Sequence, residues 1–205
     1  MPIFIRGIGL ITDEQWEEMS PSEDATRIPT KNPDRPPLYV GETPILEDAF
    51  YDAPTLAKTS WPRFEEFVAR SGRTSTLYTA ELCDLRIDLY GYGYPSPDPV
   101  RHLTHRIDDD DLDRRTAEEV LEIARLAHKA WATEGMALAV NCQAGLNRSS
   151  FVAGMVLIMD GYTADEAIAA IREARSVFCF SNEFFVKFLQ ANERVIRASA
   201  WEDAQ

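Results

Sequence analysis

Residues 136–161 read MALAVNCQAGLNRSSFVAGMVLIMDG, and within them five residues separate Cys142 from Arg148. The apolar run Met136–Val140 before the cysteine has the length of a buried strand. After the arginine an apolar, helix-like pattern continues to Gly161, and glycine is common just beyond the last residue of a helix. The stretch therefore predicts a strand, a tight loop and a helix, in that order.

Such a loop is suited to binding an anion, because backbone N–H groups converge at a helix N-terminus and the helix dipole adds positive potential. The same environment lowers the pKa of a cysteine thiol, which makes Cys142 a candidate nucleophile. Arg148 offers a planar fork for two phosphate oxygens, Gly145 permits positive φ, and Ser149 places a hydroxyl beside the thiolate. The residues predicted to bind phosphate are Gln143, Ala144, Gly145, Leu146, Asn147 and Arg148.

The string CQAGLNRS resembles the phosphate loop of the cysteine-dependent protein tyrosine phosphatases, most closely their dual-specificity branch. The family pattern is cysteine, five residues, arginine and then serine or threonine. The resemblance implies a cysteinyl-phosphate intermediate on Cys142, phosphoryl binding by Arg148, and no metal or other cofactor. One position departs from the pattern: the family usually has histidine before the cysteine, and this chain has Asn141, which can still hydrogen-bond the loop. Rhodanese-type and low-molecular-weight phosphatase loops fit less well in loop length or in position along the chain.

A phosphate monoester also needs a proton donor for its leaving group. The family takes this acid from a loop roughly thirty residues before the cysteine, and here HLTHRIDDDDLD, residues 102–113, lies at that distance. We expect Asp109 to be the general acid, because it follows the apolar Ile107 by two positions. Asp108, Asp110 and Asp111 remain alternatives, and some of the four aspartates form a solvated turn.

Composition narrows the class of protein and its partners. The chain has 205 residues, of which 45% are hydrophobic, and no apolar run approaches the length of a membrane span. The net charge of −13 argues against nucleic acid and anionic membranes as partners. The N-terminal segment MPIFIRGIGLI reads as a strand rather than a signal peptide, and a nucleophilic thiolate needs a reducing compartment. We therefore expect a cytoplasmic protein; its oligomeric state stays open.

The other patterns predict an α/β fold. We expect one phosphatase domain over residues 1–205, in which 1–37 form an extension with a strand or helix and a Pro-rich loop at 20–37. Capping boxes at Thr116 with Glu119 and at Thr163 with Glu166 predict helix starts. Strand–loop–helix order and the family resemblance both predict a three-layer domain with a mostly parallel central sheet. Further expected elements are strands at 38–40 and 82–89, a helix at Arg63–Arg70, a loop at 91–99 and a last helix capped by Ser181 or Asn182.

These features predict a metal-independent phosphatase acting on phosphotyrosine, and on phosphoserine or phosphothreonine, in proteins. Asn147 beside Arg148 is also similar to the loops of RNA 5′-triphosphatases, although the acidic chain weighs against RNA. A phosphoinositide phosphatase is a further alternative, but such loops usually carry lysines, and the residues between Cys142 and Arg148 are uncharged. A phosphate-binding module without catalysis is the alternative from another class, and Asn141 is the residue that keeps it open.

Overall fold

The computed structural model describes residues 3–5, 7–12, 15, 25–42, 82–90 and 100–200. The predicted helix Arg63–Arg70 and the predicted loop 91–99 lie outside these residues. No helix in the described ranges is long and apolar enough to cross a membrane. The elements are β1 (Ile3–Ile5), β2 (Gly9–Ile11), β3 (Ala25–Arg27), β4 (Leu38–Glu42), β5 (Leu85–Asp88), β6 (Arg101–Thr104), α4 (Arg114–Ala132), β7 (Leu138–Cys142), α5 (Arg148–Met159), α6 (Ala164–Ala174) and α7 (Glu183–Ser199).

The central sheet has five strands in the order β3-β4-β7-β5-β6. Strand β3 is antiparallel to β4, whereas β4, β7, β5 and β6 pair in parallel. All residues of β7 are buried, as expected for a central parallel strand covered on both faces. The prediction of a three-layer α/β arrangement with a mostly parallel sheet and flanking helices is confirmed.

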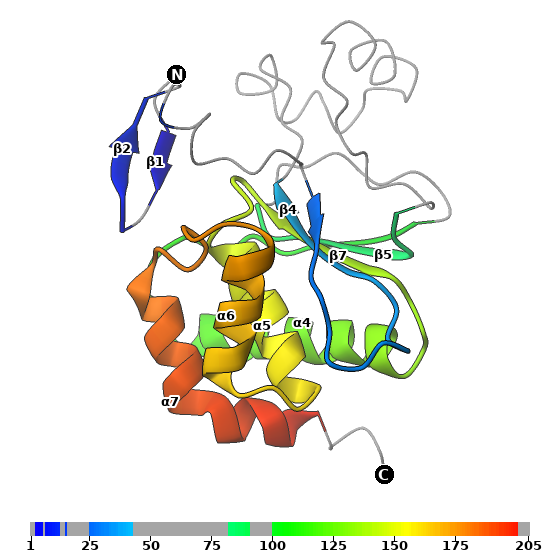
Figure 1. The fold of residues 1–205 in the computed structure, drawn as a ribbon. Coiled ribbons are helices and arrows are strands. Elements are labelled where there is room, and N and C mark those ends of the chain that lie inside the picture. Colours follow the sequence, from blue (N-terminus) through cyan, green and yellow to red (C-terminus); the bar gives the residue numbers. More distant parts are fainter. Residues whose placement is uncertain are drawn as a thin grey trace, which may run out of the picture.

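Helix α5 is the centre of the helical layer. It packs against β4 and β7, and α4, α6 and α7 pack around it (Figure 1). Every one of its residues is buried, so the helix is apolar on all sides rather than amphipathic. It ends at Met159, and Gly161 follows with φ 98°, which confirms the predicted glycine stop. The strand and helix on either side of the cysteine loop are thus fixed by the core.

Two predictions about the N-terminal part need correction. The apolar segment at the N-terminus forms two short antiparallel strands, β1 and β2, rather than one. Strand β3, within the segment 20–37 that we expected to be loop, joins the main sheet beside β4. Prolines and charged residues surround β3, and they hide so short a strand in the sequence pattern.

The predicted start of α4 is also wrong. The N-cap is Asp113, whose side chain accepts a hydrogen bond from the backbone N–H of Thr116 at 2.7 Å. Thr116 therefore lies inside the helix, and Glu119 accepts from Arg115 rather than closing a capping box. Aspartate and threonine are both good N-caps, and the residue nearer the preceding strand takes the role here.

The two other helix starts agree with prediction. Thr163 and Glu166 form the reciprocal capping box at the start of α6. At the start of α7 the Asn182 side chain accepts from the backbone N–H of Phe184 at 3.1 Å. These caps fix where α6 and α7 begin, and α7 begins beside the loops described next.

Candidate active site

The cysteine loop lies between the end of β7 and the first residue of α5. Cys142 is the last residue of the strand and Arg148 the first of the helix, so the predicted strand, loop and helix are confirmed. In a parallel sheet this edge, at the carboxyl ends of the strands, is where ligands usually bind. The backbone N–H groups at the start of α5 supply donors for an anion held in the loop.

The Cys142 side chain is buried against a hydroxyl. Its Sγ lies 3.3 Å from Oγ of Ser149, and both residues are almost fully buried. A serine hydroxyl at this distance can donate to a thiolate and stabilise its negative charge. The structure therefore brings together the sulfur and the hydroxyl that the sequence predicted to be neighbours.

Arg148 is held around the loop by three contacts. Its Nη1 donates to the backbone oxygen of Ile107 at 3.1 Å, and its Nη2 makes a long contact of 3.5 Å with the side-chain oxygen of Gln143. The guanidinium carbon lies 5.5 Å from the centre of the Tyr90 ring, in a cation–π arrangement. The Nε atom is buried and has no hydrogen-bond partner among the residues that the structure describes. Leaving such a donor unpaired costs free energy, and an oxyanion in the loop would satisfy it.

Gly145 has the positive φ that the sequence predicted, at 64°. A Cβ at this position would lie 2.6 Å from the backbone carbon of Gly41 and 2.8 Å from the backbone nitrogen of Glu42, so only glycine fits. Arg175, the C-cap of α6, donates from Nε to the Gly145 oxygen at 2.7 Å and from Nη1 to Thr26 at 3.0 Å. A buried arginine thus supports the loop from behind.

The remaining loop side chains have different surroundings. Leu146 is fully buried in the hydrophobic core, and its backbone oxygen accepts from Phe180 N at 3.0 Å. The Asn147 side chain points toward the start of α7, where its Oδ1 accepts from Ser181 Oγ at 3.0 Å and from Asn182 N at 3.1 Å. Phosphate binding by Gln143, Ala144, Leu146 and Asn147 through the backbone stays a prediction.

Asp109 contacts the cysteine loop from the acidic segment. Its Oδ2 accepts from Nδ2 of Asn147 at 2.8 Å, and its Oδ1 accepts from Nδ2 of Asn182 at 3.1 Å. Two amides therefore fix the carboxyl group, one beside Arg148 and one at the N-cap of α7. Ile107 is buried, as the choice of Asp109 assumed.

The neighbouring aspartates are arranged differently. The Asp108 side chain is 80% exposed, and its Oδ1 lies 3.7 Å from Nη2 of Arg106. Asp110 is exposed and accepts a hydrogen bond from the backbone N–H of Asp111 at 2.7 Å. Asp111 is exposed and lines a pocket at the start of α7, whereas the Asp109 side chain contacts the cysteine loop through Asn147.

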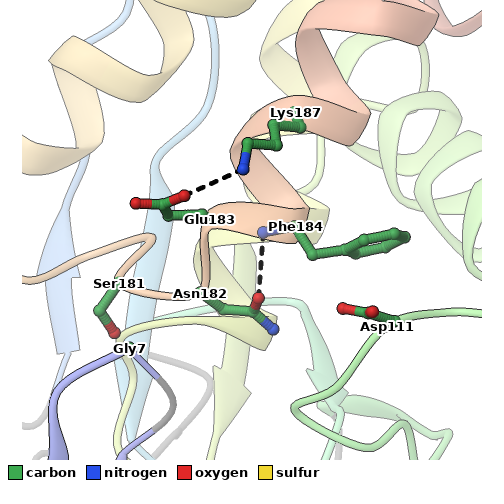
Figure 2. Close-up of a pocket in the computed structure, with 7 residues that line it drawn as sticks. All are labelled: Gly7, Asp111, Ser181, Asn182, Glu183, Phe184 and Lys187. Atoms are coloured by element: carbon green, nitrogen blue, oxygen red, sulfur yellow. Dashed lines mark hydrogen bonds and ion pairs between the residues drawn. The ribbon is translucent and has the colours of Figure 1, made fainter.

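That pocket has a volume of about 390 Å³, and Asn182 lines it. Figure 2 shows the Asn182 side chain bonded to the backbone nitrogen of Phe184, and the ion pair between Glu183 and Lys187 on the first turns of α7. The residue that caps α7 thus also borders the pocket and holds Asp109. The pocket is lined by Gly7, Asp111, Ser181, Asn182, Glu183, Phe184 and Lys187.

The sequence did not predict the partner of Asn141. Its Oδ1 accepts from Nε of Arg86 at 2.8 Å, and both side chains are buried. No local pattern around Arg86 indicates this contact, because it joins two strands far apart in the chain. The residue that stands where the family usually has histidine is thus paired with a cation.

The other two cysteines differ from Cys142 in their surroundings. Burial raises the pKa of the Cys83 thiol to about 12, although Arg86 acts in the opposite direction. Burial also raises the pKa of the Cys179 thiol, against a hydrogen bond from Ser150. Both thiols therefore stay protonated at neutral pH and are poor nucleophiles.

No protein-family model and no curated protein matches the chain by sequence. By structure it is similar to human DUSP28, at 23% identity and a TM-score of 0.53, over 87% of this chain and 99% of that one. A mouse putative dual specificity phosphatase complexed with zinc tungstate is 24% identical over 86% and 91%, with a TM-score of 0.51. The PTP-2 phosphatase of Cydia pomonella is 20% identical over 82% and 89%, with a TM-score of 0.52. The chain therefore has the fold of the dual-specificity and protein tyrosine phosphatases.

Proposed function

We propose that this chain is a phosphatase that hydrolyses phosphate monoesters on proteins through a cysteinyl-phosphate intermediate on Cys142. The observation that carries the proposal is the contact between the Cys142 sulfur and the Ser149 hydroxyl, with Arg148 at the start of α5 and its buried Nε without a hydrogen-bond partner among the described residues. A nucleophile, a fixed cation and a helix N-terminus meet at one point. Together they bind a dianion and attack its phosphorus.

In the first step the Cys142 thiolate attacks phosphorus, the bond from phosphorus to the ester oxygen breaks, and the Asp109 carboxyl group gives its proton to that oxygen. Each Asp109 oxygen accepts one amide hydrogen bond and keeps a second lone pair, so the carboxyl group can carry the proton while Asn147 and Asn182 hold it. Arg148 binds the phosphoryl oxygens throughout, and charge on them is best matched in the transition state.

In the second step a water molecule attacks the phosphorus of the cysteinyl phosphate. The Asp109 carboxylate takes a proton from that water, the bond from sulfur to phosphorus breaks, and inorganic phosphate leaves. Ser149 donates to the departing thiolate, which lowers the cost of its negative charge. Apart from the substrate and this water molecule, every group in the two steps is a side chain of the protein, so the proposal includes no metal.

Phosphorylated protein is the substrate class that charge and contacts favour. The net charge of −13 disfavours RNA and anionic lipid, which bind proteins chiefly through Lys and Arg. The triphosphatase alternative rested on Asn147 beside Arg148. The Asn147 amide is engaged by Asp109, Ser181 and Asn182, which accounts for this residue without RNA.

The test is phosphate release from matched substrates. Para-nitrophenyl phosphate separates an enzyme from a binding module, and EDTA should leave its hydrolysis unchanged. Phosphotyrosine and phosphoserine peptides, triphosphate-ended RNA and a phosphoinositide then separate the enzyme classes. We expect turnover of phosphotyrosine peptides above all others. Faster release from RNA or lipid would replace the proposed substrate class, and no turnover of any substrate would favour a binding module.

A further inference from the structure

Three polar side chains are buried together behind the cysteine loop. Arg86 is 3% exposed, and Asp88 and Asn141 are fully buried. They lie on adjacent strands, since β5 carries Arg86 and Asp88 and pairs Asp88 with Asn141 of β7. Burying an arginine is costly unless its charge and donors are matched, so the cluster calls for an explanation.

One set of contacts in this cluster leads to Asn141, the residue before Cys142. Arg86 Nε donates to Asn141 Oδ1 at 2.8 Å, and the Asn141 backbone oxygen accepts from Leu89 N at 2.8 Å. Strand β5 and the residue after it therefore hold both the side chain and the backbone of Asn141. Because Asn141 directly precedes Cys142, these contacts fix where the sulfur enters the loop.

A second set of contacts leads to Arg148, the cation proposed to bind phosphate. Asp88 Oδ2 lies 3.7 Å from Arg86 Nη2, and Asp88 Oδ1 accepts from Tyr90 N at 2.9 Å. The Tyr90 ring in turn lies against the Arg148 guanidinium, whose carbon is 5.5 Å from the ring centre. One buried cluster thus reaches Cys142 through Asn141 and Arg148 through Tyr90.

We propose that Arg86 is a positioning residue that, through Asn141 and Asp88, sets the relative placement of Cys142 and Arg148. The inference rests on the proposed function, which it deepens. A guanidinium holds a fixed position through its planar fork, and its charge acts strongly where little water screens it.

Other charged groups surround the cysteine loop, so the effect of Arg86 must be isolated by substitution. Glu42 is opposite Cys142 in strand β4, and Arg86 faces His102 across β5 and β6. Burial and Arg86 together lower the pKa of His102 to about 4, so His102 is neutral at pH 7 and Arg86 is the fixed charge of the pair. The other titratable or charged groups around the loop, within the described residues, are Asp109, Arg148, Arg175 and Cys179.

The experiment compares Arg86→Met with Arg101→Met, its matched control on the next strand. Arg101 is 57% exposed and pairs with Glu134 at the surface. Alkylation of Cys142 by iodoacetamide, followed by mass spectrometry from pH 5 to 9, reports the thiolate directly. In Arg86→Met iodoacetamide can still reach the sulfur, so alkylation of Cys142 should continue while turnover falls. For para-nitrophenyl phosphate, kcat should fall about tenfold or more with a smaller change in KM. Arg101→Met should match the wild type in both.

Two further variants keep the inference testable if Arg86→Met folds poorly. Asn141→Asp keeps the size of the side chain and its acceptor for Arg86, so its kcat should lie nearer the wild type than that of Arg86→Met. Arg86→Lys keeps the charge without the fork, and its alkylation profile should lie nearer the wild type than its kcat does. Wild-type kcat in folded Arg86→Met would overturn the inference. Alkylation does not require turnover, so an inactive wild type would instead count against the proposed function.

Discussion

Two loops meet at the candidate active site, and the protein holds them in different ways. The cysteine loop, 142–148, is closed at both ends by buried elements and supported from behind by Arg175. The acidic loop, 107–113, is largely exposed and is held mainly by buried Ile107 and by the two amides on Asp109. The cysteine loop is thus part of the buried core, whereas the acidic loop lies on the surface of the core. We therefore expect the first to bind and attack the phosphate, and the second to supply a proton from a position set by a few contacts.

The largest expected effect on activity comes from replacing Cys142, the first residue of the cysteine loop. Cys142→Ser replaces a thiol by a hydroxyl that stays protonated at neutral pH, so turnover of para-nitrophenyl phosphate should fall below detection. Binding of a phosphotyrosine peptide, measured by calorimetry, should persist because Arg148 and the loop backbone remain. Substantial activity in this variant would exclude the cysteinyl-phosphate mechanism.

The acidic loop is tested by removing its proton. Asp109→Asn should slow hydrolysis of phenyl phosphate by about 10²–10⁴-fold, the usual contribution of a general acid. Para-nitrophenyl phosphate should suffer less, because its leaving group scarcely needs a proton. The matched control is Asp108→Asn, since Asp108 is 80% exposed and pairs with Arg106. If the control shows the leaving-group dependence and Asp109→Asn does not, the acid has been assigned to the wrong residue.

A smaller loss of activity is expected when Arg148 of the cysteine loop is replaced by a side chain that keeps the charge but not the planar guanidinium. Arg148→Lys removes the bidentate fork and the contact with the Ile107 oxygen, so kcat should fall about 10²-fold, the size of losing one preorganised donor. Steady-state kinetics with para-nitrophenyl phosphate measure this directly. A change of only a few-fold would mean that Arg148 has a structural role.

The same contrast explains what the sequence could predict. The features of the cysteine loop are local, because the strand, the glycine with positive φ, the hydroxyl and the helix all lie within residues 136–161. Local patterns of this kind can be interpreted from one sequence. The prediction of where α4 starts was wrong because the local pattern allows two answers. Asp113 and Thr116 both suit an N-cap, and only the path of the chain from β6 decides between them.

The supporting contacts were beyond a single sequence because they join distant residues. Arg86 reaches Asn141 over 55 positions, Arg175 reaches Gly145 over 30, and Asn182 reaches Asp109 over 73. Ile107 is buried as expected, but it lies beyond the end of β6 at Thr104, so it is not the last strand residue that the choice of Asp109 assumed. The two amides that hold the carboxyl group have no sequence signal near Asp109.

The smallest expected effect concerns His102, which lies on the strand leading to the acidic loop and faces the arginine behind the cysteine loop. Burial, and then Arg86, lower its pKa to about 4, against an opposing effect of Asp88. In the unfolded chain the imidazole titrates near pH 6.5. Between these values the unfolded state binds a proton that the native state does not, so stability is lost as the pH falls from about 6.5 toward 4.

His102→Gln removes this proton uptake while keeping a polar side chain of similar size. The melting temperature of the wild type should fall between pH 7 and pH 5, and that of the variant should fall less, by roughly 2–4 °C for each kcal/mol recovered. Part of the fall should remain, because burial also lowers the pKa of His128 on α4. Parallel curves for the two proteins would mean that His102 is solvated and that Arg86 is screened. The cysteine loop and the acidic loop would then differ in how they are packed, but not in the electrostatic environment behind them.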